Sequence, residues 1–300
     1  MIHSITATNP QGESLKMELA RPEGSGLIIR KVDGLGPVKA TVNLTSVVGL
    51  DVSTVNSTSL DPRNIVFDIE LMAQPTIEVT RRISYNFFQL RKLVKLEVVT
   101  DTITFTTEGI VESNEPDIFS QNESVAISII CGNPYLIGTQ WISEDFSSVI
   151  AKFEFEWENG LGLNELELST RSTSNARVFE NIGDPDVGVV FKLKFTGPVT
   201  SPRIVKMIGG DALKIDSEKL ITIADGDIVA GDEIHLSTIV GDRYARLYRT
   251  GATINILGAI DPTSNWLQLP KGKTELKLEA NSGVNNIQML ADYPVYYNGV

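Results

Sequence analysis

Side chains branched at Cβ dominate this chain. Among its 300 residues, isoleucine, valine and threonine occur 30, 26 and 24 times, whereas alanine, the best helix former, occurs 15 times. Branching at Cβ restricts rotamers in a helix and suits the pleated surface of a sheet. The 24 glycines and 13 prolines are scattered along the chain, where they end many short alternating runs. This pattern predicts a mainly β protein built from sandwiches or barrels.

One segment of the first half has helical spacing instead. Val79, Ile83, Phe87 and Leu90 recur three to four residues apart, which predicts a helix there. Residues 93–111 then read as two strands joined by a tight turn, a hairpin pattern that places the helix against a sheet. The first half is therefore expected to be a β-sandwich with one helix and a long hairpin.

The second half reads as strands almost throughout. Residues 149–157 alternate aromatic with charged side chains, the period-2 pattern of a half-buried strand. Further strands are predicted at 163–168, 187–195, 204–207, 220–223, 233–239, 243–248, 275–278 and 286–290. Strands of this number and spacing predict a two-sheet sandwich of the jelly-roll kind.

The length favours two domains, because 300 residues exceed what most single cores use. The alternation breaks between residues 138 and 148. We therefore expect a first domain at 1–140 and a second at 141–300.

Charge and targeting signals exclude several classes. Acidic residues outnumber basic ones by 38 to 26, and the resulting net charge of -12 disfavours binding to nucleic acid or to an anionic membrane. No apolar run approaches the roughly 18 residues that cross a bilayer. The start lacks the basic and apolar regions of a secretory signal, so we expect the chain to be made in a reducing cytoplasm.

Metal-binding and nucleophilic residues are scarce. The chain has one cysteine, Cys131, in an apolar strand pattern, and two histidines, His3 and His235. A lone histidine on a strand is more often a surface residue than a ligand, and Cys131 has the surroundings of a buried hydrophobe. The sequences around Asp184–Asp186 and Asp225–Asp227 lack the full spacing of a calcium loop and read better as turns.

The carboxylate cluster and the phosphate-loop pattern in this chain also have structural interpretations that compete with the functional ones. Glu154, Glu156 and Glu158 line one strand face, which is more often solvated than catalytic, although a jelly-roll glycosidase remains a third hypothesis. Gly272–Thr274 ends like a phosphate loop, but Leu267 stands where its first glycine belongs. The one concentration of positive charge, residues 81–95, reads as a solvated helix or as a patch for an acidic partner. We expect no catalytic, cofactor-binding or metal-binding residues.

Several segments together resemble one family, the distal tail proteins (Dit) that form the tail-tip hub of siphophages. The most specific is 109–120, Gly-Ile-Val-Glu-Ser-Asn-Glu-Pro-Asp-Ile-Phe-Ser, followed by 127–135. The others, in family order, are 31–43, 63–70, 82–88 with 93–96, and more loosely the ending, 266–272 and 296–300.

This resemblance implies a structural virion protein without enzyme activity or cofactors. Family members form a ring, usually a hexamer, that joins the tail tube to the tail tip or baseplate and the host-adsorption apparatus. The first domain builds the ring, and the second, galectin-like jelly roll projects outward. The partners of such a ring are the tube protein, a tail-associated fibre or lysin protein and in some cases a receptor-binding protein. The expected location is the tail tip of the virion, after assembly in the host cytoplasm.

Two expectations accompany the resemblance. We expect the hairpin at 93–111 to reach a neighbouring subunit, because the edge strands of a sandwich must be covered or paired. The alternative function is a carbohydrate-binding module for host-surface recognition, for which Trp141 or Trp266 supplies the exposed ring, whereas Trp157 is expected to be buried. The galectin sugar-binding run is absent around Trp266, so that likeness concerns architecture alone.

Overall fold

The computed structural model describes residues 1–46, 51–120, 122–151, 169–173 and 175–300. The chain divides into two compact units, of which unit 1 comprises 1–139 together with 296–300, and unit 2 comprises 140–295. Strands and antiparallel sheets dominate both units, so the expected mainly β fold is confirmed. The final residues, which the sequence placed in the second domain, belong to unit 1.

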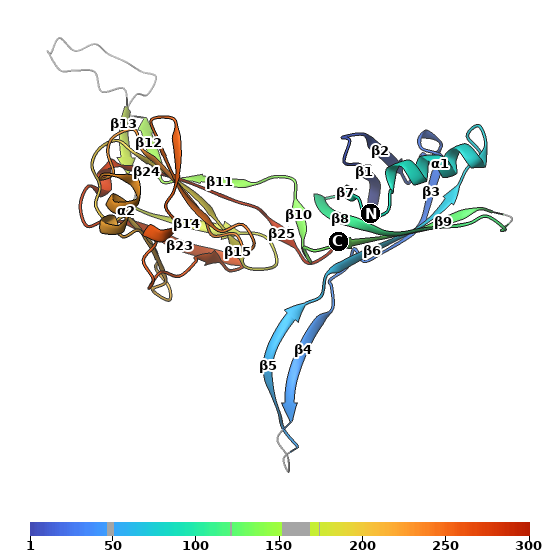
Figure 1. Ribbon diagram of the computed structural model, residues 1–300, viewed down its shortest axis with the longest axis horizontal. Coiled ribbons are helices and arrows are strands. Elements are labelled where there is room, and N and C mark those ends of the chain that lie inside the picture. The colour runs from blue at the N-terminus through green and yellow to red at the C-terminus, as the bar shows by residue number, and fades with distance from the viewer. Residues whose placement is uncertain (47–50, 121, 152–168, 174) are drawn as a thin grey trace, which may run out of the picture. The chain divides into compact units, whose positions relative to one another are not determined.

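Unit 1 is built on one large antiparallel sheet and one helix (Figure 1). The hydrogen-bonded order of its main strands is β2-β1-β7-β8-β9-β6-β3, and β10 pairs with both β8 and β25. Its elements are β1 (Ile2–Thr8), β2 (Ser14–Glu18), η1 (Pro22–Gly24), β3 (Leu27–Asp33), β4 (Ala40–Ser46), β5 (Ser53–Leu60), β6 (Arg63–Leu71), α1 (Ile77–Phe87), β7 (Leu93–Thr100), β8 (Thr104–Asp117), β9 (Ser124–Cys131), β10 (Leu136–Gly138) and β25 (Tyr296–Tyr297).

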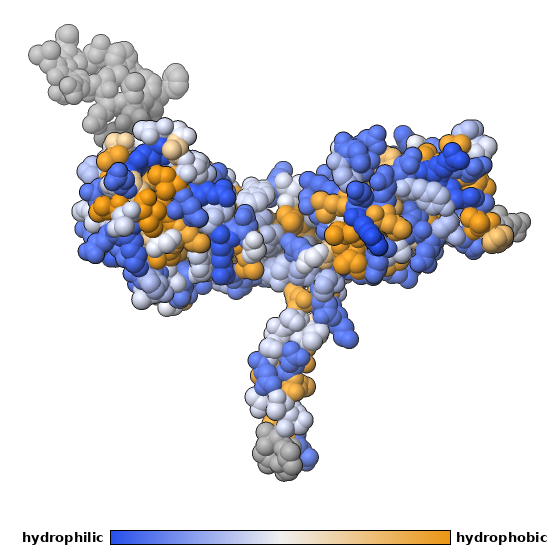
Figure 2. Space-filling model, in the orientation of Figure 1, coloured by the Kyte–Doolittle hydropathy of each residue, from blue (hydrophilic) through white to orange (hydrophobic). Residues whose placement is uncertain are grey.

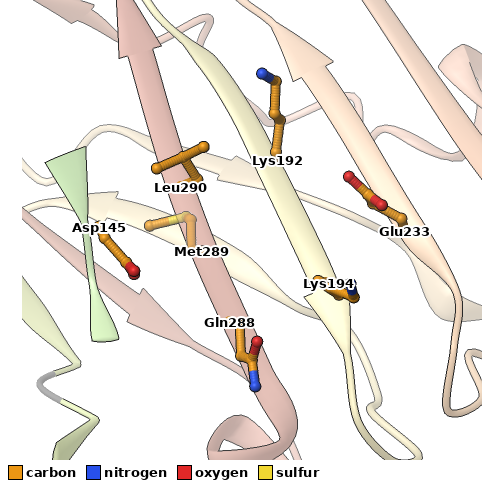
Figure 3. A pocket seen from close by; sticks show the side chains of 7 residues that line it. All are labelled: Asp145, Lys192, Lys194, Glu233, Gln288, Met289 and Leu290. Carbon is orange, nitrogen blue, oxygen red and sulfur yellow. The ribbon is translucent and has the colours of Figure 1, made fainter. Parts of the chain in front are cut away.

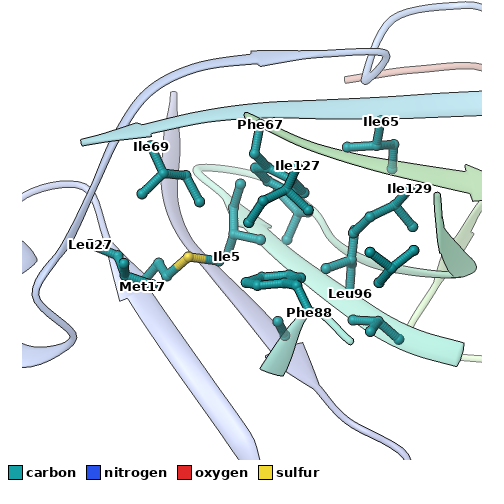
Figure 4. Packing of buried hydrophobic residues seen from close by; sticks show 14 of the residues in the cluster. Ile5, Met17, Leu27, Ile65, Phe67, Ile69, Phe88, Leu96, Ile127 and Ile129 are labelled. Carbon is teal, nitrogen blue, oxygen red and sulfur yellow. The ribbon is translucent and has the colours of Figure 1, made fainter. Parts of the chain in front are cut away.

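The core of unit 1 lies on the inner face of this sheet. Every second residue of the central strands is buried, as Val94, Leu96 and Val98 are on β7. Phe88, which follows the helix, packs among these side chains beside Phe67 (Figure 4). Alternation of this kind is what a half-buried strand requires, because successive side chains point to opposite faces.

The predicted helix is confirmed as α1, but it packs through small residues. Thr76 caps its start by accepting a hydrogen bond from the N–H of Val79. Thr80 and Ser84 are fully buried, whereas Val79 is 41% exposed. The amide of Asn114 on β8 donates to the carbonyls of Ser84 and Phe88, which ties the helix end to the sheet. The apolar stripe read from the sequence is therefore only partly buried.

The hairpin at 93–111 lies inside the sheet of unit 1, and the expectation that it also reaches a neighbouring subunit stays a prediction. Its first strand, β7, pairs with β1 on one side and β8 on the other, and β8 in turn pairs with β9. Its turn is also held, because the carboxylate of Asp101 accepts from the ammonium of Met1 and lies 2.7 Å from Nε2 of His3. Both strands thus have two partners within unit 1.

Unit 2 is a sandwich of two main antiparallel sheets. One has the order β11-β24-β16-β19-β20-β21 and the other β14-β23-β17-β18, with two short pairs, β12-β13 and β15-β22. The elements are β11 (Ile142–Asp145), β12 (Ser147–Ala151), β13 (Ser169–Thr173), β14 (Ala176–Asn181), β15 (Val187–Gly188), β16 (Val190–Phe195), β17 (Arg203–Lys206), β18 (Ala212–Lys214), α2 (Ser217–Ala224), β19 (Glu233–Ser237), β20 (Tyr244–Arg249), β21 (Ala252–Asn255), η2 (Leu257–Ala259), β22 (Gln268–Leu269), β23 (Gly272–Glu279), η3 (Val284–Asn286) and β24 (Ile287–Tyr293).

Aromatic side chains join the two sheets of unit 2. Phe179 on β14 is fully buried, and its ring lies 6.1 Å from that of Tyr293 on β24, in an edge-on arrangement. Phe146 stands 5.4 Å from Phe179 as well. Aromatic pairs at these distances and tilts are favourable beyond the area that they bury. The inner faces of the two sheets therefore meet in one core.

One predicted strand of the second half is wrong. Residues 220–223 lie in helix α2, which begins after Asp216, whose carboxylate accepts from the N–H groups of Glu218 and Lys219. Leu220 and Ala224, four residues apart, are the buried positions of the helix. A short apolar run does not distinguish a strand from a buried helix by its period, and here the capping residue decides.

A buried ion pair stabilises the loop after α2. Asp232 is 2% exposed, and Nε and Nη2 of Arg249 donate to its two carboxylate oxygens at 2.9 and 2.7 Å. Burial acts to raise the pKa of Asp232, but the bonds from Arg249 and from the N–H of Val229 outweigh it and lower that pKa below its usual value. A carboxylate with a lowered pKa stabilises the fold above the pKa that it has when unfolded, about 4.

We therefore expect Asp232→Asn to destabilise unit 2 by about 2–3 kcal/mol near neutral pH, because it removes one member of a buried pair. The loss should shrink as the pH falls through the folded-state pKa, since the wild-type carboxylate is then protonated as well. Urea unfolding at several pH values measures this. Asp184→Asn, at an exposed pair with Lys271, is the control, and an equal loss in both variants contradicts the expectation.

Candidate assembly interface

A two-stranded arm, formed by β4 (Ala40–Ser46) and β5 (Ser53–Leu60), extends from the sheet of unit 1 (Figure 1). Among the described residues, its strands β4 and β5 pair with each other and with no other strand. Every residue of both strands is exposed. A lone two-stranded hairpin is at best marginally stable in water, so the arm lacks the support that the strands of the large sheet of unit 1 give one another.

The arm has one apolar and one polar face. In its register, Ala40 lies opposite Leu60, and Leu44 lies opposite Val55. Val42 lies between them on the same face, and these valines and leucines are 40–58% exposed. A bulge at Asn56 shifts the register by one residue, which brings Val55 to the face of Leu44. The surface colouring shows apolar residues along the arm (Figure 2).

The other face is a row of small hydrogen-bonding side chains. Thr41 lies opposite Ser59, and the amide of Asn43 donates to the hydroxyl of Ser57 at 2.9 Å. Neither strand of the arm carries a charged residue. Exposed edge strands are usually protected by charges, proline or a cover, and this arm has none of them along its strands. An uncharged ribbon with an apolar face and free edges is suited to pairing with another protein.

A buried arginine organises the root of the arm. Arg63, the first residue of β6, is fully buried, and its guanidinium donates to four backbone carbonyls. Nη1 bonds the carbonyls of Gly34 and Gly36 before the arm, Nε and Nη2 bond that of Pro134, and Nη2 bonds that of Asn298 at 2.7 Å. All five donors of a guanidinium can be used in this way. One side chain thus holds three distant segments together.

The end of the chain completes this root. Val300 donates its N–H to the carbonyl of Leu35 at 3.1 Å, and the ring of Tyr296 stacks on Tyr135 at 5.8 Å. Gly34 adopts a positive φ of 86°, and a Cβ there would lie 1.8 Å from the carbonyl oxygen of Asn64. Only glycine fits such a position. The arm therefore leaves unit 1 from a closely packed base.

The candidate cysteine and the two candidate histidines each have their own surroundings in the described part of the chain. Cys131 is fully buried, and burial raises the pKa of its thiol, which disfavours the reactive thiolate. His235 lies 2.7 Å from Glu233 and against the ring of Tyr248, and His3 contacts Asp101. Across the residues with described positions, no group of three His, Cys, Asp or Glu side chains could hold a metal ion.

The other candidate residues with described positions take part in a helix end, in ion pairs or in a strand. Asp225 ends α2 in a left-handed conformation, Asp184 pairs with Lys271, and Gly272–Thr274 begins strand β23. In the basic segment, Arg81 forms an ion pair with Glu123. Trp157, Glu154, Glu156 and Glu158 lie outside the described residues. So do residues 152–157 of the strand predicted at 149–157 and the whole strand predicted at 163–168, whereas residues 149–151 lie in β12. In the described part of the chain, no helix is long and apolar enough to cross a membrane.

The arm was not predicted as a hairpin from the sequence, although part of it lies in a segment that resembles the Dit family. The available signal was two uncharged runs rich in threonine, serine and valine, on either side of Gly49-Leu50-Asp51. Alternation of apolar and polar residues in these runs predicts strands equally well inside a sheet. The absence of charge over both runs was the feature that set them apart.

Comparison with known proteins identifies the fold. No protein-family model and no curated protein sequence matches the chain. The solved structure of the SPP1 Dit protein, described as a paradigm of the hub adsorption apparatus in phages that infect Gram-positive bacteria, superimposes with a TM-score of 0.65 over 97% of this chain and 98% of that one, at 14% identity. A chain of the phage P2 baseplate, in its activated conformation with Ca, gives a TM-score of 0.50 at 12% identity, with both chains covered completely. The likeness to distal tail proteins is thus confirmed for the fold, along the whole chain.

Proposed function

We propose that this chain is a structural virion protein, the subunit of a distal tail hub. Copies of unit 1 form a ring, a hexamer in this proposal, which joins the tail tube to the tail tip or baseplate and to the adsorption apparatus. The observation that carries the proposal is the exposed, uncharged arm on a chain whose whole length has the fold of a phage hub protein. Unit 2 projects from the ring.

Ring closure gives the arm its partner. In a cyclic assembly each subunit offers the same two surfaces, so an arm from one copy meets the next copy at every interface. The apolar face of the arm is then removed from water, and its free edges are paired or covered. A closed ring also leaves no subunit with an unpaired arm, which is why a cyclic arrangement suits this feature better than an open chain.

The remaining parts of the proposal follow from the same role. The partners are the tube protein on one side of the ring and a tail-associated fibre, lysin or receptor-binding protein on the other. The chain is assembled in the host cytoplasm and resides in the tail of the virion. In this proposal the chain has no enzyme activity, because its role is to shape the tail hub and to contact the neighbouring tail proteins.

The native mass of the purified chain tests this proposal. We expect an integer multiple of 32.8 kDa, sixfold for a hexamer, by light scattering and by mass photometry. Electron microscopy of the same sample should show closed rings with a central opening. A single-chain mass at every concentration, together with no affinity for tail tube protein, would falsify the assignment.

A further inference from the structure

The outer face of the six-stranded sheet of unit 2 contains two adjoining hollows. Phe191, Leu193 and Phe195 on β16 point into the core, so Lys192 and Lys194 between them point outward. Hollows of about 430 and 220 Å³ lie on this outer face, and Lys192 lines both. The smaller one is drawn in Figure 3, where Lys192 and Glu233 stand on neighbouring strands.

The larger hollow is built from one row of residues across the sheet. The strand registers place Ser143, Asp292, Val190, Ser237 and Tyr244 side by side on β11, β24, β16, β19 and β20. All of these except Ser237 line the hollow, together with Lys192 and three residues outside the strands, Trp141, Ile239 and Asp242. The sheet itself therefore fixes the positions of most lining side chains.

Aromatic rings and an apolar floor bound this hollow. Trp141 is 51% exposed, a large exposure for a tryptophan, and stands beside β11. Tyr244 lines it as well, and the guanidinium of Arg246 lies 4.4 Å from the centre of its ring. Val190 is 8% exposed. The exposed ring of Trp141 and the face of Tyr244 that Arg246 does not cover are apolar surfaces for stacking, which is how aromatic side chains bind flat, partly apolar ligands.

Fixed polar groups stand beside the rings. Asp292 is 9% exposed, accepts a hydrogen bond from the hydroxyl of Ser143, and pairs with Nζ of Lys192 at 2.7 Å. Asp242 adds a second carboxylate. A paired carboxylate and ammonium held by a sheet provide both an acceptor and a donor without the mobility of free surface charges.

We propose that this hollow binds an uncharged saccharide. A pyranose ring presents an apolar C–H face, which matches Trp141 and Tyr244, and hydroxyl groups, which match Asp292 and Lys192. The lining carries two carboxylates and one ammonium on a chain of net charge -12, so an anionic ligand is disfavoured. A purely apolar ligand is disfavoured too, because it would remove these charged groups from water without replacing their hydrogen bonds.

The affinity of one site should be low. The hollow is open, so a single sugar is only partly enclosed, and we expect a Kd on the order of 1 mM. If the proposed ring forms, it presents one such hollow on each copy, and simultaneous contacts with one polysaccharide would raise the apparent affinity. The single site itself does not depend on the ring.

The test uses the full-length protein and defined probes. Methyl glucoside, methyl galactoside and methyl N-acetylglucosaminide are titrated while saturation-transfer NMR and tryptophan fluorescence are recorded, with glucuronate as the anionic probe. At least one neutral glycoside should bind, and glucuronate should bind more weakly. Trp141→Ala and Asp292→Asn should each weaken the binding about tenfold, which equals about 1.4 kcal/mol.

Trp266→Ala is the matched control, because Trp266 stacks under Arg243 in the same unit and does not line the hollow. Its affinity should stay within about twofold of the wild type, a small fraction of 1.4 kcal/mol. Trp141 is exposed, so its variant should fold, and an unchanged native mass separates loss of this site from loss of assembly. The proposal is overturned if no neutral glycoside binds, if Trp141→Ala binds as well as the wild type, or if glucuronate binds most tightly.

Discussion

Replacing Val42 and Leu44 together with aspartate is expected to leave a folded monomer. Both side chains lie on the apolar face of the arm, where they are 48% and 58% exposed in the single chain. The proposed interface buries them, and an unpaired carboxylate in such a place costs several kcal/mol, which equals a loss of more than a hundredfold in affinity. In the isolated chain both positions are exposed to water, so the two carboxylates cost little there. The melting temperature of the chain should therefore change little.

Size-exclusion chromatography with light scattering measures the outcome. The control carries the same two charges on the opposite face, as Thr41→Asp with Thr45→Asp, and should assemble more fully than the first variant. If the variant with charges on the apolar face assembles like the wild type, the arm is not the element that joins the subunits, and the proposed interface must lie elsewhere.

Arg63→Leu is expected to unfold unit 1 or to leave it barely stable. The substitution removes five hydrogen bonds and leaves the carbonyls of Gly34, Gly36, Pro134 and Asn298 without their buried donor. A hydrogen bond to a charged group contributes about 1.5–3 kcal/mol, and less at Gly34, Gly36 and Asn298, which are exposed residues whose carbonyls water can reach. Even if the segments relax and recover part of this, a loss of about 5 kcal/mol equals the whole stability of many domains.

Urea unfolding followed by circular dichroism checks this expectation, with separate transitions for the two units. Arg63→Lys should be intermediate, because an ammonium keeps the charge but offers fewer donors in a less fitting geometry. Arg82→Leu, which removes an exposed pair with Glu78, should change stability by less than about 0.5 kcal/mol. A variant Arg63→Leu with a wild-type transition for unit 1 would show that the root is held by other contacts.

The local spacing of apolar residues predicted most of the helices and strands. It failed where a short apolar run fits a helix as well as a strand. The helix α1 was predicted correctly because Val79, Ile83 and Phe87 keep helical spacing over about two turns. The prediction of a strand at 220–223 is wrong, since the short run Leu-Ile-Thr-Ile is compatible with either structure, and the cap at Asp216 favours the helix. The hairpin at 93–111 was correctly paired, but its neighbours in the sheet come from distant segments of the chain.

The candidate sites depend even more on contacts between segments that are far apart in the sequence. The sequence of the arm predicts strands, yet whether a strand is covered by a core is set by the rest of the fold. The hollow of unit 2 gathers residues from 141 to 292, and the registers of several strands place them together. Trp141 was identified as a candidate sugar ring from its type alone, and nothing in the sequence indicated Asp292 or Tyr244 as its neighbours.

The return of the last five residues to unit 1 makes unit 2 an insertion within the chain of unit 1. The chain leaves after Thr139 and re-enters at Tyr296, and the strands at these two points, β10 and β25, are paired with each other. Among the described residues, the core cluster of unit 1 contains none from the inserted segment. Changes in the length or sequence of the insert are therefore expected to leave that core in place, as long as β10 and β25 stay paired.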